Sequence, residues 1–544
     1  MELLAKKIIQ AAGKIGPKNA EELNAIKRNF LRESKDKTSP SSAQLLRVYH
    51  KLVKSGKLKA NAGLERVLVK RGVRTLSGVT VITVLTKPFP CPGQCIYCPL
   101  DERMPKSYLS DEPAAARALA LRFDPYQQVK KRIEALKANG HPTDKIELIV
   151  KGGTWNVYPL DYQYNFILKC FEACNRKKQG GKTTKDLTRL KKELEVSQVK
   201  NESAKHRIIG LTLETRPDYI SEKNILAMRE QGCTRIELGV QTTNEKTLKQ
   251  IKRGHDTKEV KRATALLKNY GCKVDYHLMP QLPGATPAKD LKMLKEIFSD
   301  PDYRPDMIKI YPCTVIENSE LYDWFKAGRY KTYSEKQLVK MLMEFKATVP
   351  RYVRISRLIR DIPSHHVHAG NTVTNLRQVI QEEMKKQGLK CQCLRCREIG
   401  HQINDAKLKL EKITPKLFVE KYEASGGKEY FLSFEDQKRT AVFAFCRLRL
   451  NNQPQPYSAF IRELHTYGQQ LEISVKEKLA SQHKGLGRKL VEEAEKICQK
   501  NKIQKLAVIS GVGVRGYYRK WGYKKEGTYM VKKIVWGYNS HTMI

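Results

Sequence analysis

The sequence predicts an α/β protein with a partial or complete parallel β/α barrel at its centre and a smaller α/β domain at its C-terminus. Short β-rich runs alternate with helical stretches between residues 78 and 311, and such alternation is typical of crossover units in a parallel sheet. Beyond residue 415 the runs read instead as antiparallel strands followed by a helix. A chain of 544 residues is long enough for about three domains.

Composition favours a polyanionic partner. The chain has 102 lysine and arginine residues against 57 aspartate and glutamate residues, a formal net charge of +45. This excess favours nucleic acid over an acidic protein or a small neutral substrate. We see no apolar run long enough for a membrane span, no signal peptide, and no disulfide-like spacing of the 13 cysteines. A cytoplasmic protein without a membrane partner is therefore expected.

Residues 1–77 are expected to form a small basic helical module that binds nucleic acid. Apolar residues such as Leu4, Ile8 and Ile9 recur there at helical spacing. The basic residues that would face phosphates are Lys27, Arg28, Arg47, Lys51, Lys54, Lys57 and Lys59. Tyr49 lies among the later ones in the sequence, which is typical of surfaces that stack bases. The alternative is a solvated helix face without a ligand.

The barrel is expected to span residues 78–385. Its predicted strands are 79–85, 145–150, 207–213, 234–240, 273–279 and 307–311. Functional loops of such barrels follow the strand ends, so the residues directly after the strands are candidates for cofactor contacts. They are Gly152, Gly153, Glu214, Arg216 and Gln241. Each alone is a weak signal, because glycine at a strand end often marks only a turn.

One polar segment interrupts the barrel pattern. Residues 175–206 are rich in lysine, contain two adjacent glycines and have few apolar anchors. We expect an exposed insertion there. The segment is as compatible with a merely solvated loop as with contact to RNA.

A cysteine triplet follows the first predicted strand: Cys91, Cys95 and Cys98 in CPGQCIYCP. Cysteine thiolates are the usual ligands of 4Fe-4S clusters, and three of them leave one iron open for a substrate or cofactor. A zinc knuckle normally needs four protein ligands. No fourth Cys or His lies near the triplet in the sequence, so the pattern favours the cluster.

A second cysteine group, Cys391, Cys393 and Cys396, lies in a segment expected to be a metal-binding linker, residues 386–414. Zinc or another soft metal is the natural occupant, with a structural role in pinning the barrel to the C-terminal domain. The fourth ligand stays open. The candidates are His401, His365, His366 and His368, with Cys313 more remote.

Residues 415–544 are expected to form the second α/β domain. Strands are predicted at 431–436, 441–450 and 461–468, and a glycine loop at 482–487 leads into a helix. A glycine loop that opens a helix presents unpaired N–H groups to a diphosphate. Tyr517 and Tyr518 lie farther along the chain, in the segment 506–523, where the alternative is that both are core tyrosines.

Together these motifs resemble the Elongator catalytic subunit family, which joins a radical S-adenosylmethionine (SAM) barrel to a GNAT acetyltransferase domain. The phrases that carry the resemblance are KPFPCPGQCIYCP, RFDPYQQVKKRIEAL, GLTLETRPDY, TRIELGVQ, RGHDTKEV, IRELHTYG, SQHKGLG and SGVGVRGYYRKWGY. The resemblance covers nearly the whole chain. The compact spacing of Cys91 and Cys95 suggests a prokaryotic-type member.

The resemblance implies an enzyme that forms 5-carboxymethyluridine at wobble uridine 34 of tRNA, which it binds at the anticodon stem-loop. In that reaction a 5'-deoxyadenosyl radical takes a methyl hydrogen from acetyl-CoA, the carbon radical adds to uracil C5, and the thioester is later hydrolysed. The implied cofactors are a 4Fe-4S cluster and SAM, with acetyl-CoA as substrate. Whether accessory subunits are needed stays open.

The resemblance also assigns residues. Cys91, Cys95 and Cys98 would ligate the cluster. The strand-end residues Gly152, Gly153, Glu214, Arg216 and Gln241, chosen above for their position, would contact SAM. Acetyl-CoA would contact Lys145, Glu463, Leu464, His465, Thr466, Ser481, Gln482, His483, Lys484, Gly485 and Gly487. Tyr518 would lie near the acyl group, and both Tyr517 and Tyr518 are catalytic candidates. Thr466 and Trp521 depart from the family pattern, but neither removes a charged or sulfur ligand.

Two other functions remain open from the sequence. A protein lysine acetyltransferase with a structural iron–sulfur cluster needs only the GNAT motif. A tRNA-binding scaffold without catalysis is permitted by the basic N-terminal module, yet it leaves the cysteine triplet without a purpose.

Glu463 and His465 are possible general bases, although both are compatible with a role in shaping the site only.

Overall fold

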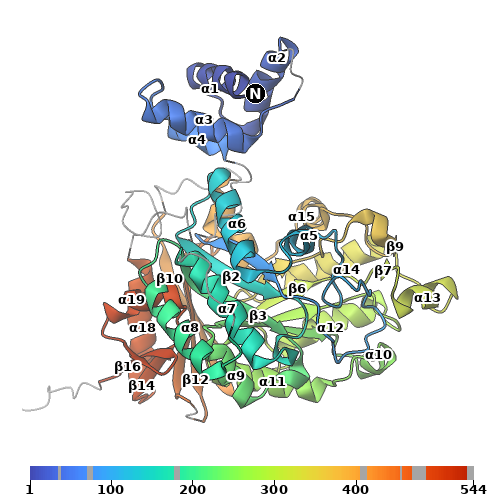
Figure 1. Ribbon diagram of the computed structural model, residues 1–544. Helices are drawn as coiled ribbons and strands as arrows, with labels where there is room; N and C mark the ends of the chain where they lie inside the picture. The colour runs from blue at the N-terminus through green and yellow to red at the C-terminus, as the bar shows by residue number, and fades with distance from the viewer. Residues whose placement is uncertain are drawn as a thin grey trace, which may run out of the picture.

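The computed structural model describes residues 1–34, 38–69, 78–176, 184–404, 413–453, 456–467 and 485–535. A group of N-terminal helices lies beside a larger body (Figure 1), which contains two seven-stranded β-sheets and a small two-stranded one. Within the described ranges no helix is both long enough and apolar enough to cross a bilayer.

The N-terminal module consists of four helices with a small core of their own. They are α1 (Glu2–Ile15), α2 (Ala20–Arg32), α3 (Ser42–Lys54) and α4 (Ala62–Leu68). The Asn19 side chain caps α2, and Ser41 forms a capping box with Gln44 at the start of α3. Leu46 of α3 packs against Gly140, directly after α6 (Pro125–Ala138), and so joins the module to the body.

The seven basic residues predicted for phosphate contact are exposed or half-exposed, as expected. Lys51 forms an ion pair of 2.9 Å with Glu2. The expectation that Tyr49 offers a surface for stacking is wrong, because its side chain is only 1% exposed and belongs to the module's core. Its hydroxyl donates to the Asn61 carbonyl at 3.1 Å.

Seven parallel strands form the central sheet, in the order β1-β2-β3-β4-β5-β6-β8. They are β1 (Thr80–Leu85), β2 (Lys145–Lys151), β3 (Arg207–Thr215), β4 (Arg235–Gln241), β5 (Lys273–Leu278), β6 (Met307–Ile310) and β8 (Arg354–Arg357). All six predicted runs form strands. The first and last strands do not pair, so the sheet is a half-barrel rather than a closed one. The sequence does not predict β8, which has only four residues, three of them polar.

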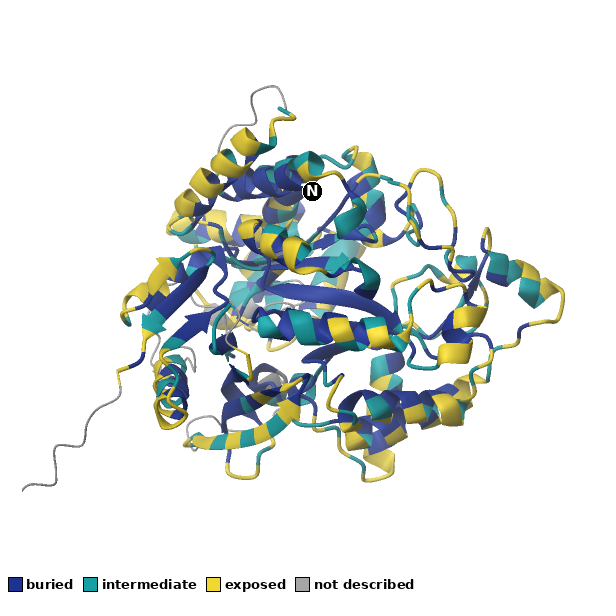
Figure 2. Ribbon diagram, turned by 90° about the horizontal axis from the view of Figure 1, so that it is seen from below, coloured by how far each residue is buried: buried dark blue, intermediate teal, exposed yellow. Residues whose placement is uncertain are grey.

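Helices cover the outer face of this sheet. They are α6, α7 (Leu160–Cys174), α8 (Leu187–Asn201), α9 (Glu222–Glu230), α11 (Thr257–Asn269), α12 (Pro287–Ser299) and α14 (Glu335–Thr348). The sides of the helices that face the sheet are buried and their outer sides are exposed, and the sheet that they cover is largely buried (Figure 2). The expectation of an exposed insertion at 175–206 is wrong for residues 187–201, because α8 packs beside α7 and buries Leu190 and Leu194. Residues 177–183 lie outside the described part of the chain.

Shorter elements complete the body around the carboxyl ends of the strands and at the junction with the C-terminal domain. They are α5 (Pro113–Ala120), α10 (Glu245–Gln250), β7 (Val315–Ile316), α13 (Glu320–Lys326), β9 (Val367–Ala369), α15 (Leu376–Lys386), α16 (Leu394–Arg397) and α17 (Ile399–Asn404). β7 and β9 pair in antiparallel fashion. Because β9 comes after β8 in the chain, this pairing folds the segment after the last barrel strand back toward β6.

The C-terminal domain is a second seven-stranded sheet, in the order β10-β11-β12-β13-β14-β16-β15. Its elements are β10 (Lys416–Ala424), β11 (Gly427–Glu435), β12 (Val442–Asn451), β13 (Ala459–Thr466), α18 (Leu486–Lys500), β14 (Lys505–Val508), α19 (Arg515–Arg519), β15 (Lys524–Glu526) and β16 (Tyr529–Lys533). The three strands predicted from 431 to 468 correspond to β11, β12 and β13. β13 pairs with β14 in parallel only as far as Ile461. β14 itself ends at Val508, the partner of Ile461.

Buried charges join the half-barrel to the C-terminal sheet. Arg462 of β13 donates to Asp306, directly before β6, at 2.9 Å, and to Glu429 of β11 at 3.2 Å. All three side chains are buried. A buried charge that loses its partner is costly, so this network fixes the two sheets relative to each other. The backbone of Gly511 also lies directly against Ile209 of β3, where no β-carbon would fit.

Candidate active site

The first cysteine triplet lies in the loop after β1. Cys95 is buried, whereas Cys91 and Cys98 are partly exposed. Arg253 donates from Nη1 to the Cys95 Sγ at 3.4 Å. A hydrogen bond with Cys98, together with the charge of Arg253, lowers the pKa of Cys95 to about 4. The thiolate, which is the form that ligates iron, is therefore favoured at this position.

The surroundings of this triplet fit an iron–sulfur cluster better than a single ion. The three sulfur atoms do not gather within 4.8 Å, and no described histidine or carboxylate joins them in a compact site. A zinc ion needs such closure, whereas a cluster is a larger group held by thiolates. The buried Nη1 of Arg216 has no hydrogen-bond partner and points at Gly93, between the first two cysteines. A β-carbon at residue 93 would overlap that nitrogen.

Arg216 is held in place by the carboxylate of Asp218. Its Nε donates at 3.0 Å and its Nη2 at 2.9 Å, which leaves Nη1 directed toward the cysteine loop. A guanidinium fixed in this way offers a preorganised donor to a carboxylate. The amino-acid portion of a ligand beside the cysteines would find its counter-charge here.

A cavity of about 790 Å³ opens beside the cysteine loop. All three cysteines line it, together with four of the five strand-end residues predicted for the cofactor: Gly153, Glu214, Arg216 and Gln241. Gly152 is the exception, because with φ at 132° it packs against Thr86 instead. Gly153 has φ at 92° and open space where a side chain would stand, as expected where a ligand approaches the backbone.

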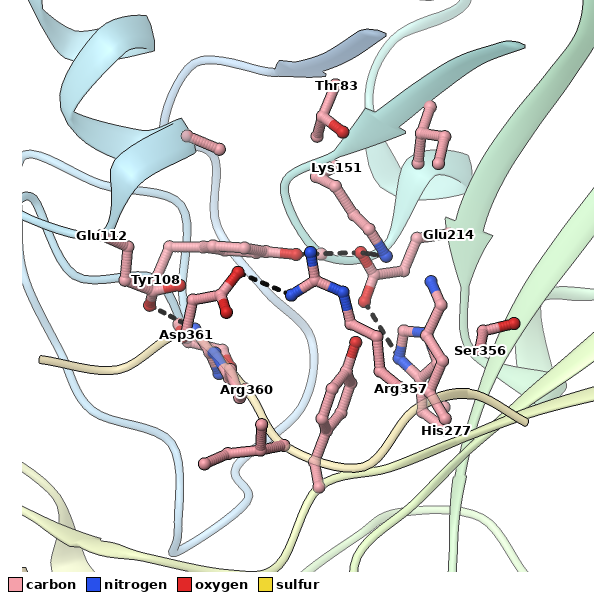
Figure 3. A pocket seen from close by; sticks show the side chains of 18 of the residues that line it. Thr83, Tyr108, Glu112, Lys151, Glu214, His277, Ser356, Arg357, Arg360 and Asp361 are labelled. Atoms are coloured by element: carbon pink, nitrogen blue, oxygen red, sulfur yellow. Dashed lines mark hydrogen bonds and ion pairs between the residues drawn. The ribbon is translucent and has the colours of Figure 1, made fainter. Parts of the chain in front are cut away.

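Glu214 is the centre of a charged cluster inside the cavity (Figure 3). Its carboxylate lies 3.3 Å from Lys151 Nζ and 3.4 Å from His277 Nδ1, and it accepts a hydrogen bond of 3.0 Å from the Tyr108 hydroxyl. Burial opposes ionisation of Glu214, but Lys151 and His277 outweigh it and lower its pKa. Glu214 is therefore an ionised residue that positions its three partners.

The sequence reasoning missed most of this cluster. Behind Glu214, the buried Glu237 pairs with Lys151 and Lys309 and lies 2.9 Å from His277 Nε2. Burial lowers the pKa of Lys309 to about 8, beside Glu237. The signal was present, because charged or polar residues stand at alternate positions of otherwise apolar runs in β2, β4 and β5. Such alternation places them together on the inner face of the half-barrel.

The cavity continues to the opposite end of the half-barrel. Glu147, Arg235, Met307 and Arg354, from the amino-terminal parts of their strands, also line it. Arg354 of β8 donates to the Tyr467 hydroxyl, directly after β13, at 3.3 Å. The same cavity therefore has the cysteine loop at one end and a residue in contact with the C-terminal sheet at the other.

On β13, the Glu463 carboxylate is held between two cationic side chains. It pairs with Arg447 of β12 at 2.9 Å and with Lys273 of β5 at 3.3 Å. Burial opposes its ionisation, but Lys273 and Arg447 outweigh it and lower its pKa to about 2. A carboxylate of this kind does not take up a proton near neutral pH. His465 stacks on Phe445 with ring centroids 5.7 Å apart.

Leu464 and Thr466 are the other predicted residues of β13. Because side chains alternate along a strand, they lie on the face opposite to Glu463 and His465, which is the face toward α18. Gly485 caps that helix with φ at 73°, a left-handed conformation that glycine adopts without strain. A β-carbon at Gly487 would lie 3.0 Å from the Tyr517 hydroxyl and 3.5 Å from Thr466 Oγ1. The start of α18, β13 and Tyr517 therefore meet. Ser481, Gln482, His483 and Lys484 lie outside the described residues.

The two predicted tyrosines differ in environment. Tyr518 is 5% exposed and packs edge-on against Tyr523, and burial raises its pKa. Tyr517 is 36% exposed, and its ring packs edge-on against Tyr518 and Trp521. The Tyr517 hydroxyl thus lies near the start of α18, and the buried Tyr518 ring packs against the Tyr517 ring.

Lys145 begins β2 at the amino end of the half-barrel. Its neighbour in the sheet is Arg207 of β3, against which Gly513 of the C-terminal domain packs. Burial lowers the pKa of Lys145. The structure therefore brings this predicted residue to the junction of the two sheets.

The second cysteine triplet forms a compact group. The sulfur atoms of Cys391, Cys393 and Cys396 all lie within 4.8 Å of one another, and the Lys346 Nζ lies 3.9 Å from the Cys396 Sγ. Three thiols this close fit one soft ion. No described side chain joins them as a fourth ligand. The predicted candidates lie elsewhere: His365 and His366 beside Asp111, His368 beside Glu317, Cys313 in a separate hydrophobic cluster, and His401 with a side chain outside the described part of the chain.

Comparison with known proteins identifies the family. Residues 90–297 match the Radical SAM superfamily, and residues 305–386 match the Radical_SAM C-terminal domain. The chain is 46% identical to a tRNA uridine(34) acetyltransferase of Methanocaldococcus infernus over 487 residues, 86% of this chain and 88% of the relative. It is 37% identical to Elongator complex protein 3 of Schizosaccharomyces pombe over 532 residues, 94% of each chain.

A solved structure agrees with these relatives. The archaeal Methanocaldococcus infernus Elp3 with an N-terminal deletion is similar with a TM-score of 0.73 and 42% identity, covering 84% of this chain and 100% of that one. The half-barrel and its cysteine loop have the architecture that the matched radical SAM family predicts. The chain therefore belongs to the radical SAM family that contains the tRNA uridine(34) acetyltransferases and Elongator complex protein 3.

Proposed function

We propose that this protein forms 5-carboxymethyluridine at wobble uridine 34 of tRNA, from acetyl-CoA and by radical chemistry. The names of its close relatives support the substrate class. The observation that carries the proposal is the continuous cavity, which the cysteine loop lines at one end and Arg354, in contact with Tyr467, lines at the other. A reaction that joins two cofactor sites needs such a shared space.

At the first end, Cys91, Cys95 and Cys98 would hold the 4Fe-4S cluster. With SAM bound, this group supplies a 5'-deoxyadenosyl radical. Arg216 would bind the SAM carboxylate through its unpartnered Nη1, while Gly153 and Gln241 border the remaining space. Glu214 keeps Lys151 and Tyr108 in fixed positions along the wall between the two ends.

At the second end, β13 would hold acetyl-CoA. Its ladder with β14 ends at Ile461, whereas its other edge pairs with β12 as far as Thr466. An extended pantetheine chain would lie along the edge that faces β14. The glycines at the start of α18 suit the diphosphate. Tyr517 is the better placed of the two tyrosines to donate to the thioester oxygen, because its hydroxyl lies near Gly487 and Thr466.

The tRNA would use the basic surface. The exposed lysine and arginine residues of the N-terminal module and the arginines that line the cavity carry charge suited to phosphates. An anticodon stem-loop bound there would place its wobble base in the cavity. A tRNA substrate also agrees with the cytoplasmic location expected from the sequence.

We also propose a structural zinc ion at Cys391, Cys393 and Cys396. The compact thiol group supports it. Arg397, directly after this group, pairs with the buried Glu435 of β11 at 2.7 Å. The ion would thus stabilise the segment that connects the half-barrel to the C-terminal sheet.

One reaction tests the function. Anaerobic, cluster-loaded protein is incubated with reductant, SAM, tRNA and acetyl-CoA labelled in the acetyl group, and the tRNA nucleosides and the protein are then analysed separately. Label in carboxymethyluridine at position 34 supports the proposal. Label only on lysine supports the protein acetyltransferase instead. Cys95→Ala should abolish the tRNA label, whereas Cys313→Ala, a buried cysteine in the same hydrophobic cluster, should retain it.

A further inference from the structure

A second group of metal-binding side chains lies outside the sites described above. Asp111 stands just before α5, and His365 and His366 lie in the single-turn helix Ser364–His366 after β8. The Nε2 atoms of His365 and His366 each lie 2.8 Å from the Asp111 Oδ2. The two imidazole centroids are 4.2 Å apart. Residues about 250 positions apart in the sequence thus converge on one point.

We propose that Asp111, His365 and His366 bind one divalent transition-metal ion of the zinc class. Two imidazoles and a carboxylate are a donor set that such ions prefer, whereas Mg²⁺ and Ca²⁺ prefer oxygen alone. Ligands at 2.0–2.2 Å around a tetrahedral ion stand roughly 3.3 Å apart. The two histidines would therefore need to move only about half an ångström outward from the carboxylate to admit the ion.

The ionic partners of Asp111 and of its neighbour Glu112 support this assignment. Glu112 pairs with Arg360 at 2.6 Å. Asp111 instead has the two histidines as its ionic contacts, and the described residues show no lysine or arginine within 4.0 Å of it. With neutral imidazoles the group carries one negative charge. The His365 side chain is 68% exposed, so water can complete the coordination.

The site would connect two segments that border the cavity. Asp111 belongs to the stretch that comes after the first cysteine triplet, and the histidines belong to the stretch that comes after the last barrel strand. Arg360 already joins these stretches, because it donates to Ser107 Oγ at 3.0 Å and stacks over Tyr108 at 5.0 Å. An ion here would strengthen this connection across the open side of the half-barrel.

A hydrogen-bonded trio without metal is the competing explanation. One carboxylate oxygen can accept from two N–H groups, and both imidazoles would then carry their proton on Nε2. Metal binding requires the proton of each neutral ring to move from Nε2 to Nδ1, because a ligating nitrogen offers its lone pair. The two explanations therefore differ in whether added Zn²⁺ binds.

The test counts zinc in the full-length, cluster-loaded protein. Isothermal titration with Zn²⁺ and elemental analysis after gel filtration are applied to wild type, Asp111→Asn, the double variant His365→Gln with His366→Gln, and the control His368→Gln. His368 is a nearby histidine that contacts Glu317 at 3.2 Å and is not part of the trio. The three ligands are at least 30% exposed, so these substitutions leave the core intact.

Wild type and His368→Gln should each bind one zinc equivalent more than Asp111→Asn and the double variant, with equal iron in all four proteins. Zn²⁺ should also slow amide exchange over residues 107–112 only in the two proteins that keep the ligands, and Mg²⁺ should not replace it. Equal zinc content in all four proteins overturns the proposal. Equal slowing of exchange in the variants overturns it as well.

Discussion

The two cysteine triplets of this chain differ in spacing, and the difference decides what each can hold. In the first, three residues separate Cys91 from Cys95, and the sulfur atoms stand apart beside an open cavity. In the second, one residue separates Cys391 from Cys393, and the three sulfur atoms gather within 4.8 Å. Wider spacing in a loop leaves room for a cluster, whereas close spacing encloses a single ion.

The surroundings of the two triplets also differ, because the first is open to a cavity and the second is enclosed. The first triplet faces Arg216, whose unpartnered Nη1 is available to an anionic ligand, and it opens onto the cavity. The second is covered by Lys346 and is adjoined by Arg397, which is buried against Glu435. A catalytic metal keeps an open position, and a structural one is closed. The surroundings therefore suit a reactive centre at the first triplet and a structural ion at the second.

The largest effect is expected from Cys98→Ala. Loss of one thiolate from a three-ligand cluster removes the cluster, so iron content and carboxymethyluridine formation should both fall to background. Zinc content and the unfolding temperature should stay close to wild type, because the second triplet is untouched. Iron and zinc are measured in the same sample by elemental analysis. Simultaneous loss of both metals would show that the triplets are not independent.

Cys393→Ser should produce the opposite pattern. The ion would be lost while the iron remains, and the free energy of unfolding should fall by about 3–5 kcal/mol, as is usual when a structural metal is removed. Differential scanning calorimetry measures the change. Cys174→Ser, at a buried cysteine of α7, controls for the loss of a thiol from the core. A variant that keeps its zinc and melts like wild type would contradict the structural role.

Glu435→Gln tests how the second triplet is fastened to the C-terminal sheet. Burial raises the pKa of Glu435, but Arg397 and Arg439 outweigh it and hold that pKa below 4.5. Since the folded-state value lies below the unfolded one, the ion pair stabilises the protein above about pH 4.5 and this contribution disappears as the pH falls further.

The variant should lose about 3 kcal/mol of stability at pH 7, and its unfolding free energy should depend less on pH below about 4.5. Urea unfolding at a series of pH values provides both numbers. An unchanged pH slope in the variant would show that Glu435 does not titrate as described.

A smaller effect is expected at the first triplet from Gly93→Ala. The added methyl group would overlap Arg216 Nη1 and displace the guanidinium. We expect the KM for SAM to rise by roughly tenfold, equivalent to about 1.4 kcal/mol, with the iron content unchanged. Gly516→Ala, where the new carbon meets open space, is the matched control. Equal KM values for the two variants would remove Arg216 from SAM binding.

The sequence predicted the parts of the fold that depend on local pattern. The six long strand runs, the helical N-terminal module and the cysteine loop after β1 are confirmed. The strand β8 was missed because its four residues, RISR, have no apolar alternation long enough to stand out. The helix α8 was missed because its two core leucines are surrounded by lysine and glutamate, which read as an exposed loop.

The site was predictable only in part, because some of its residues are brought together from separate segments of the chain. Strand-end residues such as Glu214 and Arg216 are expected from the topology of a parallel sheet, and they do line the cavity. The inner cluster of Lys151, Glu237 and Lys309 depends on which face of three separate strands points inward. The Arg354 contact to Tyr467 joins two domains, so the pattern of either segment alone could not reveal it.

The most direct test of the central claim is the yield of 5'-deoxyadenosine. Wild-type protein with full iron and sulfide content is reduced anaerobically with SAM, and the nucleoside is quantified with and without tRNA and acetyl-CoA. The account predicts its formation in wild type, with an increase when both substrates are present, and none in Cys98→Ala. No 5'-deoxyadenosine from fully loaded wild type, with tRNA and acetyl-CoA present, would contradict it.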